Sequence, residues 1–197
     1  MLKVGITGGI GSGKSLVCDV FKLFGIPVYH ADWEAKKLYD DNKELADAIV
    51  SLFGIRMRTD DGKINKKELA AIIFSDAKAL QAVNQLVHPL VALHFDNWCQ
   101  LNQSSPYIIK EAAILFESDA YLSMDKIITV TAPVDVRIQI AVLRDGASAG
   151  QIEERISKQS SDEYKVDRSD WVIVNNGKQL IIPMVYKIHR LLIESAR

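Results

Sequence analysis

The chain has 197 residues, of which 48% are hydrophobic and 25% charged, and its formal net charge is −1 at pH 7. This composition predicts a globular protein with a hydrophobic core, and the balanced charge argues against nucleic acid or an anionic membrane as a partner, because both attract basic surfaces. No apolar run approaches the roughly 20 residues that span a bilayer, and the short apolar N-terminal run lacks the form of a signal peptide. We therefore expect a cytoplasmic protein.

The two cysteines, Cys18 and Cys99, are far apart in the sequence and lack the spacing of metal ligands. Cytosolic proteins rarely form disulfides. We expect both cysteines to be buried, reduced thiols.

A short apolar strand, Leu2 to Thr7, is expected to lead into a glycine-rich segment. Gly8, Gly13, Lys14 and Ser15 fit the pattern G-x-x-x-x-G-K-[S/T] of the phosphate-binding loop (P-loop). Its glycines permit positive φ angles and the close approach of backbone N–H groups to an anion. The helix expected from residue 15 to 24 adds its positive dipole end. The segment therefore predicts a nucleoside triphosphate site.

The P-loop pattern also predicts individual roles. Lys14 should reach the β- and γ-phosphates of ATP, and the Ser15 hydroxyl should ligate Mg²⁺. The other expected ATP contacts come from the loop and the first helical turn, at Gly9, Ile10, Gly11, Ser12, Gly13 and Leu16.

A second short strand is predicted at Ile26 to Tyr29, and Asp32 follows it. The carboxyl ends of parallel strands converge where ligands bind. The carboxylate of Asp32 could therefore accept the proton of an incoming hydroxyl group as a general base. The spacing suits equally well an N-cap of a helix over Trp33 to Tyr39.

From about residue 33 to 103 the pattern is almost entirely helical. Asn65 with Glu68 resembles a capping box that opens a helix at Lys66, and Asp76 could cap a long helix that reaches beyond residue 98. Pro89 in this long helix should interrupt or kink it. The preceding His88 is compatible with a packed imidazole at such a kink.

The strand pattern returns after the helical stretch. Strands are expected at Tyr107–Lys110, Lys126–Thr131 and Trp171–Val174, and helices from Pro133 to about Leu143, over Gln151–Gln159, and from Lys178 onward. Strands that alternate with helices predict a parallel α/β sheet with right-handed crossovers. We predict a core of residues 1–32 and 104–197, with residues 33–103 inserted as a helical subdomain.

The segment from Arg144 to Arg168 holds five basic and six acidic residues, which is typical of a solvated surface. Arg155 and Gln159 are four residues apart, on one face of a predicted helix. An arginine brought over the phosphates from this segment could stabilise the transition state. The segment is therefore either an ordinary surface or a lid.

Three classes of P-loop protein compete for this chain. A GTPase usually carries N-K-x-D and D-x-x-G motifs, and neither string occurs here. A kinase needs an acceptor site, a base and a basic lid, and candidates for all three are present. The alternatives are a kinase for another small molecule or nucleotide, and a regulatory module driven by nucleoside triphosphate hydrolysis.

Several segments, in the same order along the chain, resemble dephospho-CoA kinase. They are Thr7–Ser15 with Asp32 in an Ala-Asp pair, Val87-His-Pro-Leu90, Glu111-Ala-Ala-Ile-Leu-Phe-Glu117, Arg155-Ile-Ser-Lys-Gln159 and Asp170-Trp-Val-Ile-Val-Asn175. The resemblance implies a P-loop kinase of three layers that uses ATP and Mg²⁺ to phosphorylate the ribose 3′-hydroxyl of dephospho-CoA, giving CoA and ADP. It implies no obligate protein partner.

The resemblance also implies roles for residues. Asp32 would be the catalytic base, Lys14 and Arg144 would be further catalytic groups, and the segment 144–168 would be the lid. The helical insert would bind the CoA substrate, and Asn175 and Asn176 would lie near the adenine of ATP. The expected substrate contacts, besides Asp32, are His88, Pro89, Glu111, Leu115, Arg155 and Gln159. Glu111 could orient Mg²⁺ through water or be simply solvated.

The chain departs from the family pattern at a few positions. His30 stands where the family usually has aspartate, Ala113 where it has proline, Ile140 where it often has arginine, and Leu16 where threonine is common. A missing guanidinium at position 140 would weaken contacts to phosphate. We expect Arg137 or Arg144 to compensate for it.

Overall fold

The computed structural model describes residues 1–196. Contacts between residues divide the chain into two compact units. The core unit combines Met1–His30 with Asn102–Arg197, and the helical unit is Ala31–Leu101.

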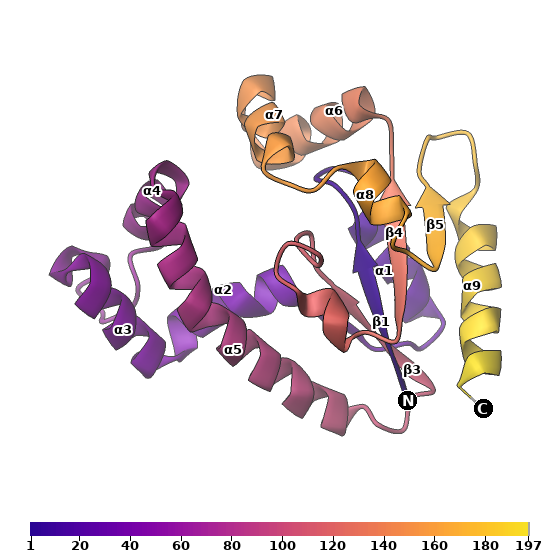
Figure 1. Ribbon diagram of the computed structural model, residues 1–197, viewed down its shortest axis with the longest axis horizontal. Helices are drawn as coiled ribbons and strands as arrows, with labels where there is room; N and C mark the ends of the chain where they lie inside the picture. Colours follow the sequence, from indigo (N-terminus) through magenta and orange to yellow (C-terminus); the bar gives the residue numbers. More distant parts are fainter. Residues whose placement is uncertain (197) are drawn as a thin grey trace. The chain divides into compact units, whose positions relative to one another are not determined.

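The core unit is built on a sheet of five parallel strands, in the order β2-β3-β1-β4-β5 (Figure 1). Each strand is short, and all but β2 hold two or more β-branched residues, as expected where helices cover a parallel sheet. All five residues of the strand Tyr107–Glu111 are buried. The strands are β1 (Leu2–Thr7), β2 (Val28–His30), β3 (Tyr107–Glu111), β4 (Lys126–Thr131) and β5 (Trp171–Val174). The parallel α/β prediction is confirmed.

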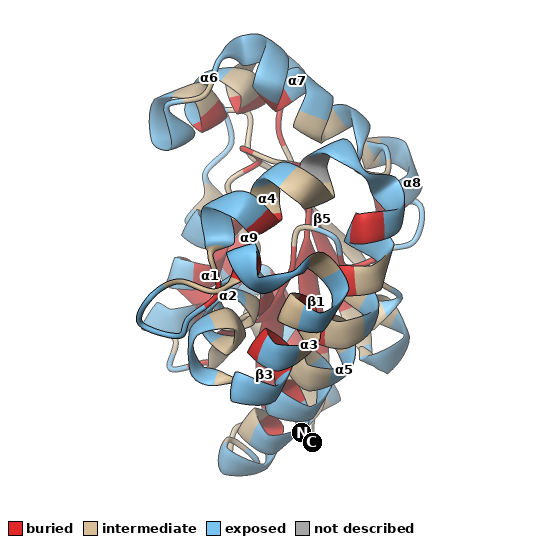
Figure 2. Ribbon diagram, turned by 90° about the vertical axis from the view of Figure 1, so that its left-hand side faces the viewer, coloured by how far each residue is buried: buried red, intermediate tan, exposed pale blue. Residues whose placement is uncertain are grey.

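Helices α1 and α9 pack together beside this sheet (Figure 1). Val17, Phe21 and Leu192 from the two helices are fully buried in one cluster with Ile6 and Val130 of the strands. Figure 2 shows these buried positions concentrated along the strands and the helix faces that meet them. The core-unit helices are α1 (Lys14–Leu23), η2 (Ala120–Ser123), α6 (Val134–Asp145), α7 (Ala149–Ser157), α8 (Asp162–Val166) and α9 (Ile181–Ser195).

The helical unit has its own hydrophobic core. Leu45, Ile49, Met57, Val83 and Val87 are among its buried residues. Its elements are α2 (Ala31–Asp41), α3 (Lys43–Phe53), η1 (Ile55–Met57), α4 (Lys66–Ser75) and α5 (Ala77–Leu101). As predicted, the side chain of Asn65 caps α4 by accepting the N–H of Glu68.

The structure decides two points that the sequence left open in the helical unit: Pro89 does not interrupt the long helix, and Asp32 is not an N-cap. α5 is one helix of 25 residues that continues through Pro89, although proline inside a helix costs about 3 kcal/mol. The buried side chains of Val83 and Val87, each contributing about 1.5–3 kcal/mol, offset that cost. α2 begins at Ala31, so Asp32 lies inside its first turn and is not the N-cap.

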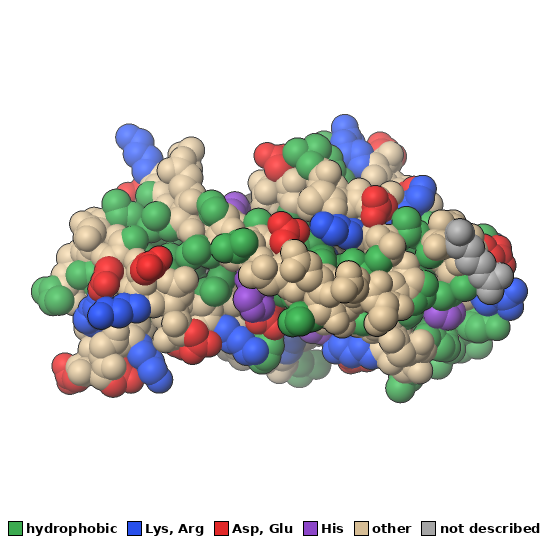
Figure 3. Space-filling model, turned by 90° about the horizontal axis from the view of Figure 1, so that it is seen from below, with side chains coloured by type: hydrophobic (Ala, Val, Ile, Leu, Met, Phe, Trp, Pro, Cys, Tyr) green, Lys and Arg blue, Asp and Glu red, His purple; other side chains and the backbone are tan. Residues whose placement is uncertain are grey.

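Charged side chains are scattered over the face shown in Figure 3. Lysine and arginine lie there among aspartate and glutamate, with polar and hydrophobic surface between them. No helix within residues 1–196 is both long enough and apolar enough to cross a bilayer. Both cysteines are buried and neither forms a disulfide within residues 1–196, as expected.

Candidate active site

The P-loop joins β1 to α1 at the carboxyl end of the central strand. Gly8, Gly11 and Gly13 have φ angles of 147°, 76° and 94°, which other residues rarely adopt. A Cβ atom at Gly8 would lie 2.1 Å from the carbonyl oxygen of Val130. The loop therefore needs glycine at this position both for its backbone angle and for its close approach to β4.

Lys14, at the start of α1, is only 9% exposed. Its ammonium group donates hydrogen bonds to the carbonyl oxygens of Gly8 at 3.0 Å and Gly9 at 3.3 Å, and therefore lies across the loop. The hydroxyl groups of Thr7 and Ser12 are buried and have no hydrogen-bond partner among the described residues. Buried hydroxyls normally have partners, so these two groups are consistent with a site for a polar ligand.

Three side chains from distant parts of the chain hold the loop. The Oε1 atom of Gln159 accepts the N–H of Ile10 at 3.0 Å, and Arg137 donates to the carbonyl oxygen of Ile10 at 3.0 Å. The side-chain amide of Asn175 donates to the carbonyl oxygen of Ser12 at 3.0 Å. The loop conformation therefore depends on α6, on the end of α7 and on the end of β5.

Arg137 is a residue that sequence reasoning assigned only a compensating role. It is 3% exposed and lies against the loop, whereas Ile140 on the same helix is 40% exposed. One feature of the sequence pointed to a functional role for Arg137. This arginine lies one helical turn before position 140, in a segment that follows a predicted strand. Its contact with Ile10 spans 127 residues, and no local pattern reveals such a contact.

Asn175 and Asn176 follow β5 beside the P-loop. The side-chain amide of Asn175 donates to the carbonyl oxygen of Ser12. Oδ1 of Asn176 accepts the N–H groups of Lys178 at 3.0 Å and Gln179 at 3.1 Å. These contacts shape the turn before α9. A contact of either asparagine with adenine stays a prediction.

His30 and Glu111 lie at the carboxyl ends of the neighbouring strands β2 and β3. The Nδ1 atom of His30 is 3.0 Å from Oε2 of Glu111, which is 8% exposed. Glu111 is also in register with Ile6 of β1, next to the residue that opens the P-loop. The carboxylate therefore belongs to the same edge of the sheet as the loop.

Two arginines of the predicted lid, Arg144 and Arg155, are paired with the carboxylate of Asp145. Arg144 donates to Asp145 at 2.7 and 3.1 Å, and this hydrogen bonding raises the pKa of the Arg144 guanidinium above its ordinary value. Arg155 donates to the same carboxylate at 3.1 Å. Both guanidinium groups are about half exposed. In this arrangement Asp145 holds both of them.

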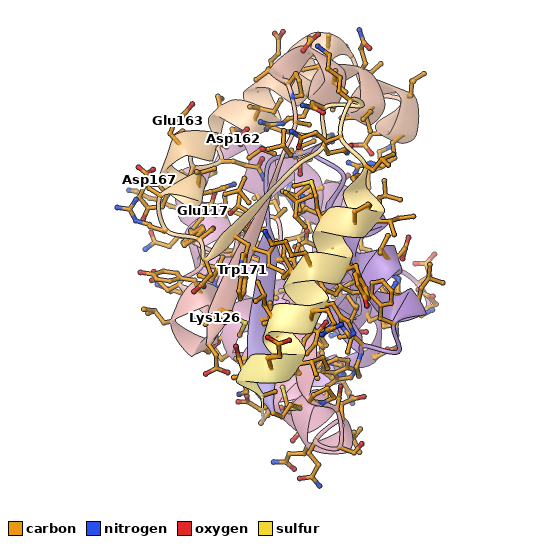
Figure 4. All side chains as sticks on the ribbon, turned by 90° about the vertical axis from the view of Figure 1, so that its right-hand side faces the viewer. Glu117, Lys126, Asp162, Glu163, Asp167 and Trp171 are labelled. Atoms are coloured by element: carbon orange, nitrogen blue, oxygen red, sulfur yellow. The ribbon has the colours of Figure 1, made fainter. Side chains whose placement is uncertain are left out.

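An ion pair between a buried lysine and Glu117 joins α8 to the segment after β3, and Glu117 is labelled in Figure 4. Lys165 is fully buried, and its ammonium nitrogen is 3.3 Å from Oε1 of Glu117, within ion-pair range though without the angles of a regular hydrogen bond. Glu117 also accepts the N–H of Ser160 at 2.7 Å. Burial alone would raise the pKa of Glu117, but this hydrogen bond and Lys165 outweigh it and lower the pKa.

The other predicted substrate contacts divide between the two units. Leu115 of the core unit is fully buried, with Cδ2 2.7 Å from where a Cβ of Gly5 would lie, which assigns it a packing role. Asp32, His88 and Pro89 belong to the helical unit. His88 and Pro89 line an open hollow on one face of α5, together with Ala77, Leu80, Gln81, Asn84 and Gln85.

The P-loop has a residue that suits the Mg²⁺ ion of a bound nucleoside triphosphate. Among residues 1–196, no three His, Cys, Asp or Glu side chains form a cluster that could hold a metal by itself. Mg²⁺ usually keeps several waters and takes only one or two protein ligands plus phosphate oxygens. The hydroxyl of Ser15, exposed in the first turn of α1, is a suitable protein ligand of this kind.

Comparison with known proteins identifies the family. The family model described as dephospho-CoA kinase matches residues 2–180. A dephospho-CoA kinase of Bacteroides fragilis (strain YCH46) is 39% identical over 187 residues, 95% of this chain and 91% of the relative.

Two solved structures share the fold. TT1252 from Thermus thermophilus superposes with a TM-score of 0.84 at 27% identity and covers 96% of both chains. Dephospho-CoA kinase from Campylobacter jejuni superposes with a TM-score of 0.73 at 24% identity, over 99% of this chain and 98% of the other. From the matches in sequence and fold together, this chain belongs to the dephospho-CoA kinase family.

Proposed function

We propose that this protein transfers the γ-phosphoryl group of ATP to the ribose 3′-hydroxyl of dephospho-CoA and releases CoA and ADP. The observation that carries the proposal is a P-loop with its full set of glycines and Lys14, in a chain of this family. Both substrates are water-soluble, so we infer an enzyme that works in the cytoplasm and needs no obligate protein partner.

The donor site is the P-loop. The backbone N–H groups from Gly9 to Leu16, other than those of Ile10 and Ser12, and the N-terminus of α1 bind the phosphates of ATP. The N–H of Ile10 donates to Gln159 and that of Ser12 to Gly9. Lys14 exchanges its two carbonyl contacts for the β- and γ-phosphates and neutralises charge on the transferring group. The Ser15 hydroxyl would hold the Mg²⁺ ion of the nucleotide, which would supply further positive charge there. Asn175 and Asn176 are the proposed contacts for the adenine end.

The acceptor side is assigned to the helical unit. Its residues 31–101 bind dephospho-CoA, and His88 and Pro89 shape the surface that receives it. Asp32 follows His30 of β2 by two residues. Its carboxylate holds the 3′-hydroxyl in line with the γ-phosphorus and accepts its proton. Glu111 would help to orient Mg²⁺ through water.

The segment 144–168 is the proposed lid. Closure brings Arg144 and Arg155 from Asp145 to the phosphates, where a guanidinium stabilises developing charge. The side chain of Gln159 already contacts the loop through Ile10. Closure excludes water, which would otherwise hydrolyse ATP without transfer.

The testing experiment measures ADP formation from ATP and Mg²⁺ with and without dephospho-CoA, followed by mass analysis of the product. We expect ADP only with the acceptor, and a product one phosphate heavier at the 3′ position. Lys14→Ala should abolish transfer, whereas Lys22→Ala on the exposed face of α1 should not. ADP formation that depends on another small hydroxyl compound, or on a macromolecule, would support one of the two alternative functions instead.

A further inference from the structure

Arg137 is a buried arginine for which the transfer mechanism has no direct use. Its guanidinium group donates from Nε to the carbonyl oxygen of Ile10 at 3.0 Å and from Nη1 to Oδ2 of Asp162 at 2.7 Å. Its side chain is only 4% exposed and that of Asp162 25% exposed. A buried charge with one partner removed is costly, so this pair strongly favours one position of the guanidinium.

Two P-loop glycines leave room for Arg137. A Cβ atom at Gly9 would lie 1.9 Å from Nη2 of Arg137, and a Cβ at Gly11 would lie 2.2 Å from its carbonyl oxygen. Gly9 does not have a positive φ, so its backbone conformation does not demand glycine. The contact with Arg137 therefore accounts for glycine at position 9.

Asp162 connects this arrangement to the proposed lid. It is the first residue of α8, and Lys165 on the same helix pairs with Glu117. Figure 4 shows Asp162, Glu117 and Glu163 around this helix. Glu163 is exposed, whereas Asp162 is half-buried against Arg137. Arg137 therefore joins the tip of the P-loop to a helix of the segment 144–168.

We propose that Arg137 is a positioning residue for phosphoryl transfer. It holds the carbonyl of Ile10 so that the neighbouring N–H groups of the loop face the phosphates, and Asp162 fixes the guanidinium that does so. Arg137 acts through Ile10 and does not touch the substrate. This inference rests on the proposed donor site, but it does not depend on which acceptor is used.

The first test therefore omits the acceptor. ATP binding is measured by calorimetry for the wild type, Arg137→Met, Arg137→Lys and Asp162→Ala, and folding is followed by thermal unfolding. Arg137→Met removes the hydrogen bond to the carbonyl oxygen of Ile10 and the charge-assisted hydrogen bond to Asp162. Without them the loop is no longer held in position, so ATP binding should weaken about tenfold or more. Arg137→Lys should recover part of the affinity. Arg190→Met, in an exposed pair on α9, is the matched control and should bind like the wild type.

The second test is a double-mutant cycle between Gly9→Ala and Arg137→Ala. In the wild-type background the new methyl group displaces the guanidinium, so Gly9→Ala should weaken ATP binding as much as Arg137→Ala does. In the Arg137→Ala background the space is open, and Gly9→Ala should cost less than about twofold. If Gly9→Ala has the same effect in both backgrounds, the proposed role is wrong.

Steady-state kinetics separates positioning from a general loss of structure. The KM for ATP should rise in Arg137→Met, while the KM for dephospho-CoA stays within about twofold of the wild-type value. A lower thermal midpoint with unchanged ATP affinity in the folded protein would assign Arg137 a purely structural role. If the wild type binds ATP but does not phosphorylate dephospho-CoA, the proposed function fails, and the binding experiments still decide the role of Arg137.

Discussion

His30 and Glu111 form a pair across two neighbouring parallel strands, with Nδ1 of the histidine 3.0 Å from Oε2 of the glutamate. The family usually has aspartate at position 30, so this chain has a hydrogen-bonding imidazole where its relatives would have a second carboxylate. The imidazole orients Glu111 without adding negative charge at the carboxyl edge of the sheet.

The first prediction concerns this glutamate and Mg²⁺. Glu111→Gln keeps the shape of the side chain and a hydrogen bond to His30 but removes the negative charge to which we assign the orientation of Mg²⁺ through water. We expect the Mg²⁺ concentration for half-maximal activity to rise about tenfold, with little change in urea unfolding. A magnesium titration of ADP formation checks this. An unaltered titration would show that Glu111 has no role toward Mg²⁺ and only pairs with His30.

The second prediction concerns the proposed base. Asp32→Asn keeps the size of the side chain but removes its ability to accept a proton. We expect turnover to fall about 100-fold or more, with ATP affinity unchanged. Asp19→Asn, at an exposed position on α1, is the control. Turnover near the wild-type value in the Asp32 variant would remove this residue as the base.

The third prediction concerns Arg144, in the segment that we propose as the lid. Arg144 is more than half exposed, and its pair with Asp145 should contribute less than about 1 kcal/mol to stability. Arg144→Met should therefore unfold like the wild type while turnover falls about tenfold or more. Thermal unfolding and initial rates on the same preparations separate the two effects. Equal rates would leave Arg144 as a surface residue paired with Asp145.

The fourth prediction concerns acid stability. The pKa of Glu117 is below its ordinary value of 4.5 in the folded protein, so the unfolded chain binds more protons in acid. The stability from this group is complete above about pH 4.5 and is lost as the pH falls through the lower, folded value. Glu117→Gln should therefore lose less stability between pH 6 and pH 3 than the wild type does.

Urea unfolding at a series of pH values measures this difference. At neutral pH the Glu117→Gln variant should be the less stable protein, because it leaves the buried ammonium of Lys165 without its carboxylate. Glu163→Gln is the matched control for stability at neutral pH. The carboxylate of Glu163 is fully exposed and lies on α8, the helix of Lys165. Parallel pH profiles for the wild type and Glu117→Gln would contradict the prediction.

The sequence by itself determined the P-loop, the parallel sheet and the boundaries of most strands. These features depend on short-range rules: the glycine spacing, apolar runs of strand length, and caps such as Asn65. Local rules did not decide two points: α5 is not interrupted at Pro89, and α2 starts before Asp32, which is therefore not an N-cap. A proline favours a break in a helix, and a capping residue favours a helix start. Both tendencies are local, and burial of neighbouring side chains can outweigh them.

Only the tertiary structure decided how the loop is held. Arg137 meets Ile10 across 127 residues, Gln159 meets it across 149, and Asn175 meets Ser12 across 163. A buried guanidinium and two amides find these partners only after the strands have paired and brought α6, α7 and β5 to one edge of the sheet. Such contacts have no sequence period, because their geometry is set by the fold and not by neighbours along the chain.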